Sequence, residues 1–179
     1  MDSDQIKTKA RELGFELAGV APLGPSPEAE FYPEWLASGY AGEMHYLERG
    51  ARTRLEPSRL LPGTRSVIVC ALNYQTNRLL TSSDPERAWV SRYAWGEADY
   101  HDLIRDRLHQ LADFLRMQVP AARTRGVVDT APLLEREFAQ LAGLGWIGKN
   151  TLLLSKQAGS YFFLAGILTD QILHYDTEH

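Results

Sequence analysis

The chain has 179 residues, 44% of them hydrophobic, and a formal net charge of −4, so it is long enough to fold as one domain around a buried core. Its single cysteine excludes a disulfide framework. Because it also lacks an apolar run of about 18 residues and a signal-like start, we expect a soluble, cytoplasmic protein with no membrane contact. The negative charge is not that of a general nucleic-acid coat, so any RNA contact must come from a local basic patch.

The first part of the chain predicts a helix, a strand and a second helix. Ser3 is a candidate cap for a helix with one apolar face, and residues 15–21 are typical of a strand. The short second helix is rich in aromatic residues. Trp35 and Tyr40 are expected in the core, because large aromatic side chains are usually buried.

A long, irregular and basic stretch runs from Gly39 to Gly63. It is either a solvated loop or an anion-facing patch, because guanidinium groups bind phosphates through two parallel hydrogen bonds. A phosphate-bearing cofactor or an RNA backbone would suit such a patch. Its arginines are Arg49, Arg52, Arg54 and Arg59.

Residues 66–73 are apolar on both faces, which predicts a central strand covered on both sides. Cys70 within it should be an inert, buried thiol, and no His or Cys lies near it at metal-ligand spacing, so no metal site is predicted. Further on, Asp99 is a candidate cap for a helix with an apolar stripe. A single histidine near a helix start, here His101, is more often a surface or hydrogen-bonding residue than a catalytic one.

Residues 124–129 predict a strand that Asp129 terminates, and Pro132 is expected in the first turn of the following helix. Asp129 is therefore either a working carboxylate or simply the cap of that helix. Its apolar neighbours would raise its pKa by desolvation, and a nearby helix N-terminus would lower it, so the sequence leaves the balance open.

The glycine-rich turn at residues 143–148 imitates the dinucleotide and phosphate-loop motifs. Both motifs require a strand before the glycines and a helix after them. Here the expected order is reversed, because a helix precedes and apolar strands at 151–154 and 161–169 follow. A helix end with a tight turn is the simpler interpretation, and close approach of the backbone to a flat ligand is a third.

The strands at 15–21, 66–73, 124–129, 151–154 and 161–169 alternate with helices. We therefore predict a single α/β (α+β) sandwich spanning residues 1–179, with a central mixed β-sheet flanked by helices.

Seven runs, in the same order along nearly the whole chain, resemble the cobalamin-dependent epoxyqueuosine reductases. That family shares its catalytic half with reductive dehalogenases and cobalamin-processing proteins, so the resemblance implies a nitroreductase-like topology. The runs are LGFELAGVA, WLASGYAGEMHYLER, RLEPSRLLPGTRSVIV, SRYAWGEADYHDLIRDRL, VDTAPLLER, AGLGWIGKNTLLL and GSYFFLAGILTD.

The resemblance further implies reduction of epoxyqueuosine to queuosine in the anticodon region of tRNA, with cobalamin as cofactor. The epoxide oxygen needs a proton in order to leave, and Asp129 matches the family's proton-donor position. The residues implied to lie at the cofactor are Arg54, Arg92, Tyr93, Asp129, Leu153, Leu154 and Ser155, and those implied to face the tRNA are Arg136 and Lys149.

The sequence departs from the family in three ways. The spacer before Asp99 is one residue longer than usual, which puts Arg92 and Tyr93 in doubt, and Gly166 replaces an acidic residue. The family's two [4Fe–4S] clusters each need about four thiolates, which one cysteine cannot supply, so we expect a truncated or naturally shortened relative. We also expect a monomer. A cobalamin-binding or trafficking module without catalysis, and an FMN-dependent nitroreductase-like enzyme, remain alternatives.

Overall fold

The protein folds around one antiparallel sheet. The computed structural model describes residues 2–24, 28–77, 86 and 88–177. The sheet has the order β1-β2-β6-β3, and each neighbouring pair is antiparallel. Its strands are β1 (Leu17–Pro22), β2 (Ser66–Asn73), β6 (Phe162–Thr169) and β3 (Thr124–Val128).

The prediction of a mixed sheet is therefore wrong, although the α/β class is confirmed. β2 and β3 do run in the same direction, as a crossover through a helix requires. However, β6 lies between them and runs opposite to both, so no two parallel strands become neighbours. This insertion depends on a strand that comes last in the chain, and periodicity cannot reveal it.

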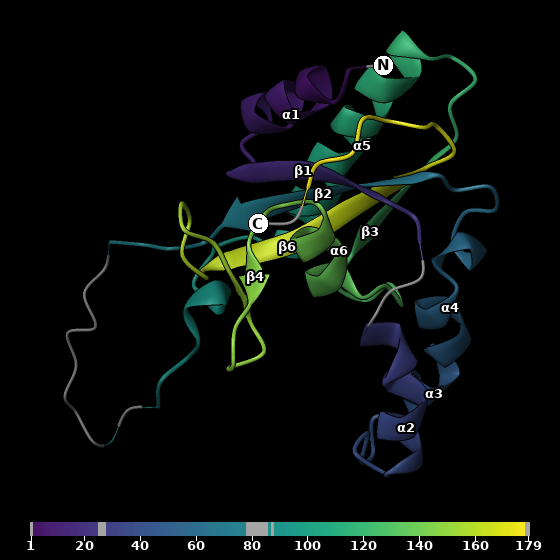
Figure 1. The fold of residues 1–179 in the computed structure, drawn as a ribbon. Coiled ribbons are helices and arrows are strands. Elements are labelled where there is room, and N and C mark those ends of the chain that lie inside the picture. Colours follow the sequence, from purple (N-terminus) through teal and green to yellow (C-terminus); the bar gives the residue numbers. More distant parts are fainter. Residues whose placement is uncertain (1, 25–27, 78–85, 87, 178–179) are drawn as a thin grey trace.

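Helices cover both faces of the sheet (Figure 1). The helices α1 (Ser3–Glu12) and α5 (Tyr100–Gln118) pack on one face, and α6 (Glu135–Leu141) packs on the other. β2 serves both layers, because Ile68 and Cys70 belong to the first core and Val67 and Val69 to the second. The predicted central strand is thus confirmed, and burial raises the pKa of the Cys70 thiol to about 12.

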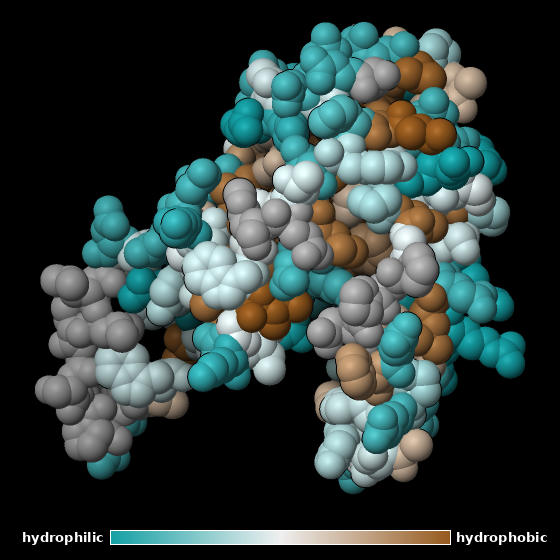
Figure 2. Space-filling model, in the orientation of Figure 1, coloured by the Kyte–Doolittle hydropathy of each residue, from teal (hydrophilic) through white to brown (hydrophobic). Residues whose placement is uncertain are grey.

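Three short helices form an arm that projects from the sheet body (Figures 1 and 2). None of them has a buried residue, and the prediction that Tyr40 lies in the core is wrong, because 68% of it is exposed. Trp35 is half-buried and stacks on Tyr32 with a centroid distance of 5.9 Å. The arm consists of α2 (Tyr32–Ala37), α3 (His45–Arg49) and α4 (Ala51–Leu55), with short 3-10 turns at Glu28–Glu30 and Pro57–Arg59.

Two predicted helix starts differ from the structure. Asp2 rather than Ser3 caps α1, because the buried Ser3 hydroxyl instead donates to the carbonyl of His174 at 2.5 Å. α6 begins at Glu135, after the predicted first turn at Pro132. Its cap is Leu134, which makes no side-chain capping bond, so Asp129 does not cap this helix.

The glycine-rich turn joins α6 to the small hairpin of β4 (Trp146–Ile147) and β5 (Leu153–Leu154). Gly143 takes a left-handed φ of 71° directly after the helix, as a helix-ending glycine does. A Cβ on Gly145 would lie 2.0 Å from the carbonyl oxygen of Leu154. The glycines therefore allow close approach of the chain's own backbone, in the expected order of helix, turn and strand.

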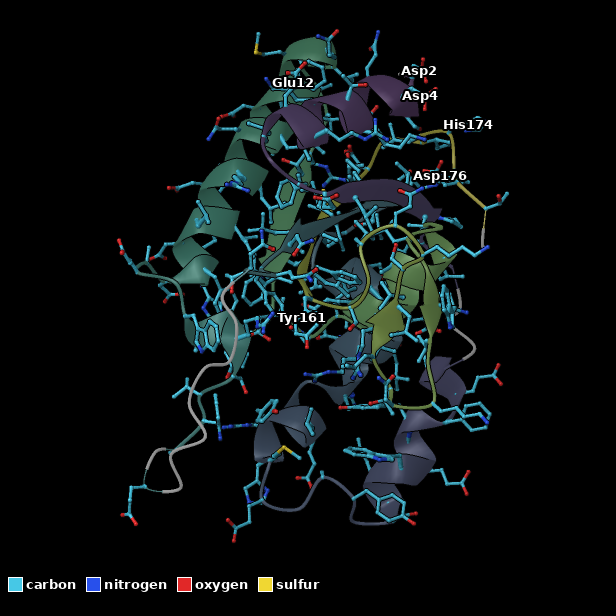
Figure 3. The ribbon with its side chains drawn as sticks, turned by 90° about the vertical axis from the view of Figure 1, so that its left-hand side faces the viewer. Asp2, Asp4, Glu12, Tyr161, His174 and Asp176 are labelled. Carbon is cyan, nitrogen blue, oxygen red and sulfur yellow. The ribbon has the colours of Figure 1, made fainter. Side chains whose placement is uncertain are left out.

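The last described residues of the chain contact β1 and α1. Asp176 accepts hydrogen bonds from the backbone of Val20 at 2.9 Å and from Lys7 at 2.7 Å. Figure 3 shows Asp176 and His174 close to the start of α1. None of the helices in the described ranges is long and apolar enough to cross a membrane.

Candidate active site

The candidate site is centred on Asp129, directly after β3. Asp129 has a φ of 45°, a left-handed conformation that costs most residues about 1–2 kcal/mol but that Asp tolerates better. This turn carries the chain away from the edge of the sheet, and 57% of the Asp129 side chain is exposed. A carboxylate on a strained turn, open to a ligand, is a common feature of functional sites.

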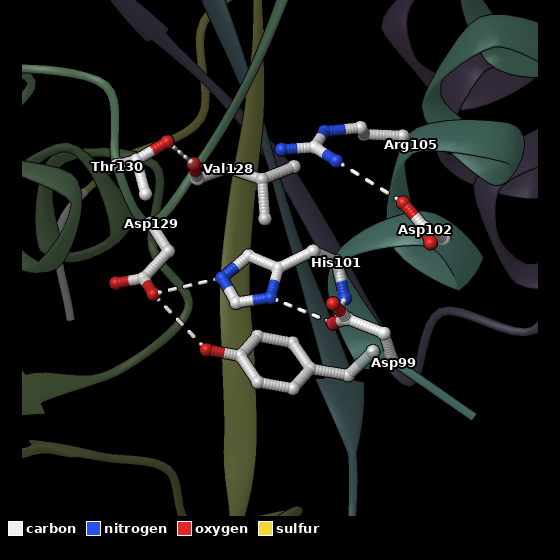
Figure 4. Close-up of polar contacts among 8 residues, drawn as sticks. Asp99, His101, Asp102, Arg105, Val128, Asp129 and Thr130 are labelled. Atoms are coloured by element: carbon white, nitrogen blue, oxygen red, sulfur yellow. Dashed lines mark hydrogen bonds and ion pairs between the residues drawn. The ribbon is translucent and has the colours of Figure 1, made fainter. Parts of the chain in front are cut away.

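Two side chains from the first turn of α5 meet the Asp129 carboxylate (Figure 4). The hydroxyl of Tyr100 donates to its Oδ2 at 3.0 Å, and Nε2 of His101 lies 3.0 Å from the same oxygen. Asp99 caps α5 as predicted, accepting from the backbone of His101 at 2.8 Å, and it also contacts Nδ1 of that ring at 2.8 Å. The helix cap therefore orients the ring that faces Asp129.

The charges of the site favour a protonated imidazole. The contact with Asp99, followed by the contact with Asp129, raises the pKa of His101 above its usual value. Burial, together with the bond to Asp129, raises the pKa of Tyr100 to about 12. Tyr100 therefore stays a hydrogen-bond donor at neutral pH, and both groups direct a proton at the same carboxylate oxygen.

An aromatic cluster extends from the group formed by Asp129, Tyr100 and His101. The ring of Tyr100 stacks on Phe163 of β6 at a centroid distance of 4.0 Å and an interplanar angle of 7°. Tyr93 meets both rings edge-on at 6.4 Å. Tyr74 packs against Phe163 at 4.7 Å and against Tyr161 at 5.7 Å. The cluster fixes Tyr100 by packing, so its hydroxyl can hold one position.

A second carboxyl, that of Glu135, lies close enough to Asp129 for the charge of Asp129 to act on it. Its Oε1 is buried and has no hydrogen-bond partner among the described residues. The pKa of Glu135 is raised to about 8, first by burial and then by the negative charge of Asp129, against the lowering effect of Arg136, Arg54 and the Asp129 backbone amide. The site thus contains two interacting carboxyls.

The predicted cofactor residues fall into two groups. Arg54, Arg92 and Tyr93 surround the site: Arg54 acts on Glu135 by its charge, Tyr93 joins the aromatic cluster, and the Arg92 guanidinium lies over Tyr161 at 5.4 Å. Arg54 also lies over the Tyr32 ring at 5.9 Å.

The second group, on the small hairpin, is turned largely inward. Leu153 and Ser155 are buried, and Leu154 is half-buried. The Ser155 hydroxyl accepts from the backbone of Gln157 and Ala158 at 3.3 and 3.4 Å, which closes a local turn. Any ligand contact here would therefore involve backbone or shape.

The predicted RNA-facing residues come from two elements, because Arg136 lies on α6 and Lys149 lies in the loop between β4 and β5. Arg136 donates to the carbonyl of Thr151, and Lys149 is exposed on the same loop. Arg136 therefore has a structural partner, and Thr151 holds a left-handed φ of 64° beside it.

Sequence reasoning missed Tyr100 and Glu135, and it treated His101 as a surface or hydrogen-bonding residue, of which the structure shows the hydrogen bonds. A tyrosine or glutamate at a helix start is too common to stand out. The one available signal was the Asp-Tyr-His run at a predicted helix cap, where side chains at successive positions spread around the helix start.

Comparison with known proteins identifies similar chains. Residues 54–130 match the family model described as "Epoxyqueuosine reductase QueG, DUF1730". The chain is 44% identical over 97% of its length to an epoxyqueuosine reductase of Pseudomonas aeruginosa and 40% identical to that of Escherichia coli. It spans about half of these curated relatives, 49% and 46% respectively.

Solved structures show the same relationship. A crystal structure of epoxyqueuosine reductase with a tRNA-Tyr stem loop aligns with a TM-score of 0.86 at 27% identity, over 99% of this chain and 47% of that one. A reductive dehalogenase described in terms of B12-dependent dehalogenation aligns with a TM-score of 0.59 at 17% identity, over 98% of this chain and 20% of that one, which shows a shared fold. The resemblance expected from the sequence is therefore confirmed: along almost its entire length this chain is homologous to about half of an epoxyqueuosine reductase.

Proposed function

We propose that this chain forms the cobalamin-binding catalytic domain of an epoxyqueuosine reductase, which reduces epoxyqueuosine to queuosine in the anticodon region of tRNA. The observation that carries the proposal is the exposed Asp129 carboxylate, held between Tyr100 and His101. It stands at the position that the resemblance assigns to the proton donor. The single domain 1–179, its nitroreductase-like topology, its monomeric state and its cytoplasmic location belong to the same proposal.

The residues around Asp129 fit a large flat cofactor better than a cluster of iron and sulfur. Tyr93, which packs against Tyr100, is 49% exposed, and Tyr161, which packs against Tyr74 in the same aromatic cluster, is 43% exposed, so both offer aromatic surface to a corrin. Arg92 lies next to them and donates to the carbonyl of Thr76 at 3.2 Å. In contrast, the one thiol is Cys70, buried in β2 with a pKa of about 12, and it cannot ligate a [4Fe–4S] cluster.

The proposed chemistry assigns the proton to the protein. When bound, cobalamin supplies the electrons that break the carbon–oxygen bond of the epoxide. Asp129 delivers one proton to the epoxide oxygen, and a second proton, taken from solvent, completes the water molecule that leaves. Tyr100 and His101 fix the carboxyl group in position through its Oδ2, and the aromatic cluster excludes water on one side.

The tRNA contact is assigned to Arg136 on α6 and to Lys149 in the loop between β4 and β5. Arg136 and Lys149 would meet phosphates, which position an RNA backbone without reading its sequence. The relative crystallised with a tRNA stem loop supports tRNA as the substrate class.

The experiment compares Asp129→Asn with the parent chain, supplied with chemically reduced cobalamin and an RNA stem loop that carries epoxyqueuosine. Asn preserves size, so cobalamin binding and melting temperature should change little, while the rate should fall by about 10²–10⁴-fold. Asp102→Asn, which alters an exposed carboxylate on α5, is the control and should keep the parent rate. A folded, cobalamin-binding Asp129→Asn protein with the parent rate would exclude Asp129 as the proton donor.

A further inference from the structure

Glu135, the first residue of α6, has no role in the proposed function. Its Oε1 is buried without a hydrogen-bond partner, and so is Nη1 of Arg54 on the facing helix α4, among the residues that the structure describes. Buried polar atoms are nearly always paired. An unused acceptor and an unused donor, close enough for their charges to interact, therefore indicate a site that has a second arrangement.

Charged groups from three elements face the Glu135 carboxyl. They are Asp129 after β3, Arg136 on α6 itself and Arg54 on α4, together with the backbone amide of Asp129. Burial and the charge of Asp129 outweigh the two arginines, and with a pKa of about 8 Glu135 holds its proton at neutral pH. Meanwhile Oδ2 of Asp129 accepts from Tyr100 and faces His101, which is the acceptor pattern of a carboxylate.

We propose that Glu135 is a positioning residue that stores the proton used by Asp129. The two carboxyls share one proton, which resides on Glu135 while Asp129 is open to water and passes to Asp129 when ligands cover it. Glu135 thereby changes from carboxylic acid to carboxylate, and Asp129 changes in the opposite direction, so the charge of the pair is unchanged. This inference rests on the proposed role of Asp129 as proton donor.

The exchange follows from burial and charge. A flat cofactor and a nucleotide over Asp129 would remove water from it and disfavour its charged form. The Glu135 carboxylate that results has Arg136 beside it and the unused Nη1 of Arg54 near it. Like-charged carboxyls in one site titrate as a coupled pair, so removing one must change the titration of the other.

A carboxyl ¹³C NMR titration tests the pair without any catalytic assay. In the chain as described, Glu135 should titrate near pH 8. Asp129→Asn should lower that midpoint, because it removes the neighbouring negative charge, and Asp102→Asn should leave it unchanged. Titration of Glu135 in the ordinary glutamate range, or a midpoint that Asp129→Asn does not move, would overturn the inference.

A pH profile of the reduction tests the consequence for the reaction. Glu135→Gln keeps the size of the side chain but cannot store a proton, so the alkaline limb of kcat/KM should move to lower pH by at least about 1 unit. Glu12→Gln, which alters an exposed glutamate on α1, should keep the parent profile. If Asp129→Asn abolishes turnover while Glu135→Gln keeps the parent profile, Asp129 remains the donor and the proton store is rejected. If Asp129→Asn retains turnover, the proposed function itself fails.

Discussion

His101 lies between two carboxylates, and its contacts with them raise the pKa of its imidazole ring. Its Nδ1 faces Asp99 and its Nε2 faces Asp129, at 2.8 and 3.0 Å. A ring nitrogen facing a carboxylate on each side favours the doubly protonated imidazolium. Because Asp99 also caps α5, the same residue starts the helix and orients the ring.

This arrangement predicts the effect of Asp99→Asn. Asn caps helices as well as Asp does, so α5 should persist, but the loss of the negative charge should lower the pKa of His101. Histidine-ring NMR titration measures this shift directly. Asp102→Asn is the matched control on the same helix turn and should have a smaller effect. An unchanged His101 titration in Asp99→Asn would show that the contact with Asp99 does not control the ring.

At the scale of elements, the turn after α6 sets the position of the small hairpin. Gly145 passes so close to the carbonyl of Leu154 that no side chain fits between them. Gly166, in the middle of β6, is less tightly enclosed, because a Cβ there would lie 3.2 Å from Cγ2 of Val127, a side-chain atom. The acidic residue expected there by family resemblance would be buried beside Val127 and the carbonyl of Ile68.

Gly145→Ala should consequently destabilise the protein by about 1–3 kcal/mol, the usual range for overpacking. The backbone of the hairpin must shift, and Trp146 and Leu154 would lose their pairing. Urea unfolding measures the change in the free energy of unfolding. Gly24→Ala is the control, because a Cβ on Gly24 meets nothing within 4 Å. Equal stabilities of the two variants would contradict the close approach.

At the scale of the whole molecule, two raised pKa values give the stability a defined pH dependence. Glu135 has a pKa of about 8 in the folded chain against an ordinary value of 4.5, and the pKa of His101 is also raised. The folded chain therefore binds more protons than the unfolded chain, and stability falls as pH rises. The contribution of Glu135 is fully present below pH 4.5 and is lost as pH rises through about 8.

The free energy of unfolding should accordingly fall between pH 5 and pH 9 by on the order of a few kcal/mol, since one pKa unit corresponds to about 1.4 kcal/mol. Urea titrations across this range measure it. Glu135→Gln should flatten the slope, whereas Glu12→Gln, at an exposed position on α1, should keep it. A parent protein whose stability rises over this range would refute the assignment of a buried, protonated Glu135.

The whole chain should bind cobalamin and not FMN, and it should hold no stoichiometric iron–sulfur cluster. The aromatic surface beside Asp129 suits a corrin, and one buried thiol cannot replace four thiolates. Equilibrium dialysis with each cofactor, and iron and sulfide analysis after anaerobic reconstitution, measure the two parts. Tight FMN binding without cobalamin binding, or about four irons per chain, would contradict them.

Local patterns determined much of the secondary structure. The run of residues 66–73, apolar on both faces, predicted β2 with its observed bounds. Asp99 was identified as the cap of α5, and Gly143 ends α6 as predicted. These features could be predicted because burial pattern, helix capping and left-handed backbone each depend on only a few neighbouring residues. The Asp129 position was also visible, through its place after a strand and through family resemblance. Even so, the sequence left open whether Asp129 caps a helix.

Only the tertiary structure decided the rest. The insertion of β6 between β2 and β3 made the sheet antiparallel, and the projecting arm left Tyr40 exposed. The partners of Asp129 come from positions 28 and 29 residues away along the chain. The pKa of Glu135 depends on its burial and on charges from separate elements, among them Asp129 after β3 and Arg54 on α4. Such contacts join segments that are distant in sequence, and periodicity, which reports only the faces of single elements, cannot encode which faces meet.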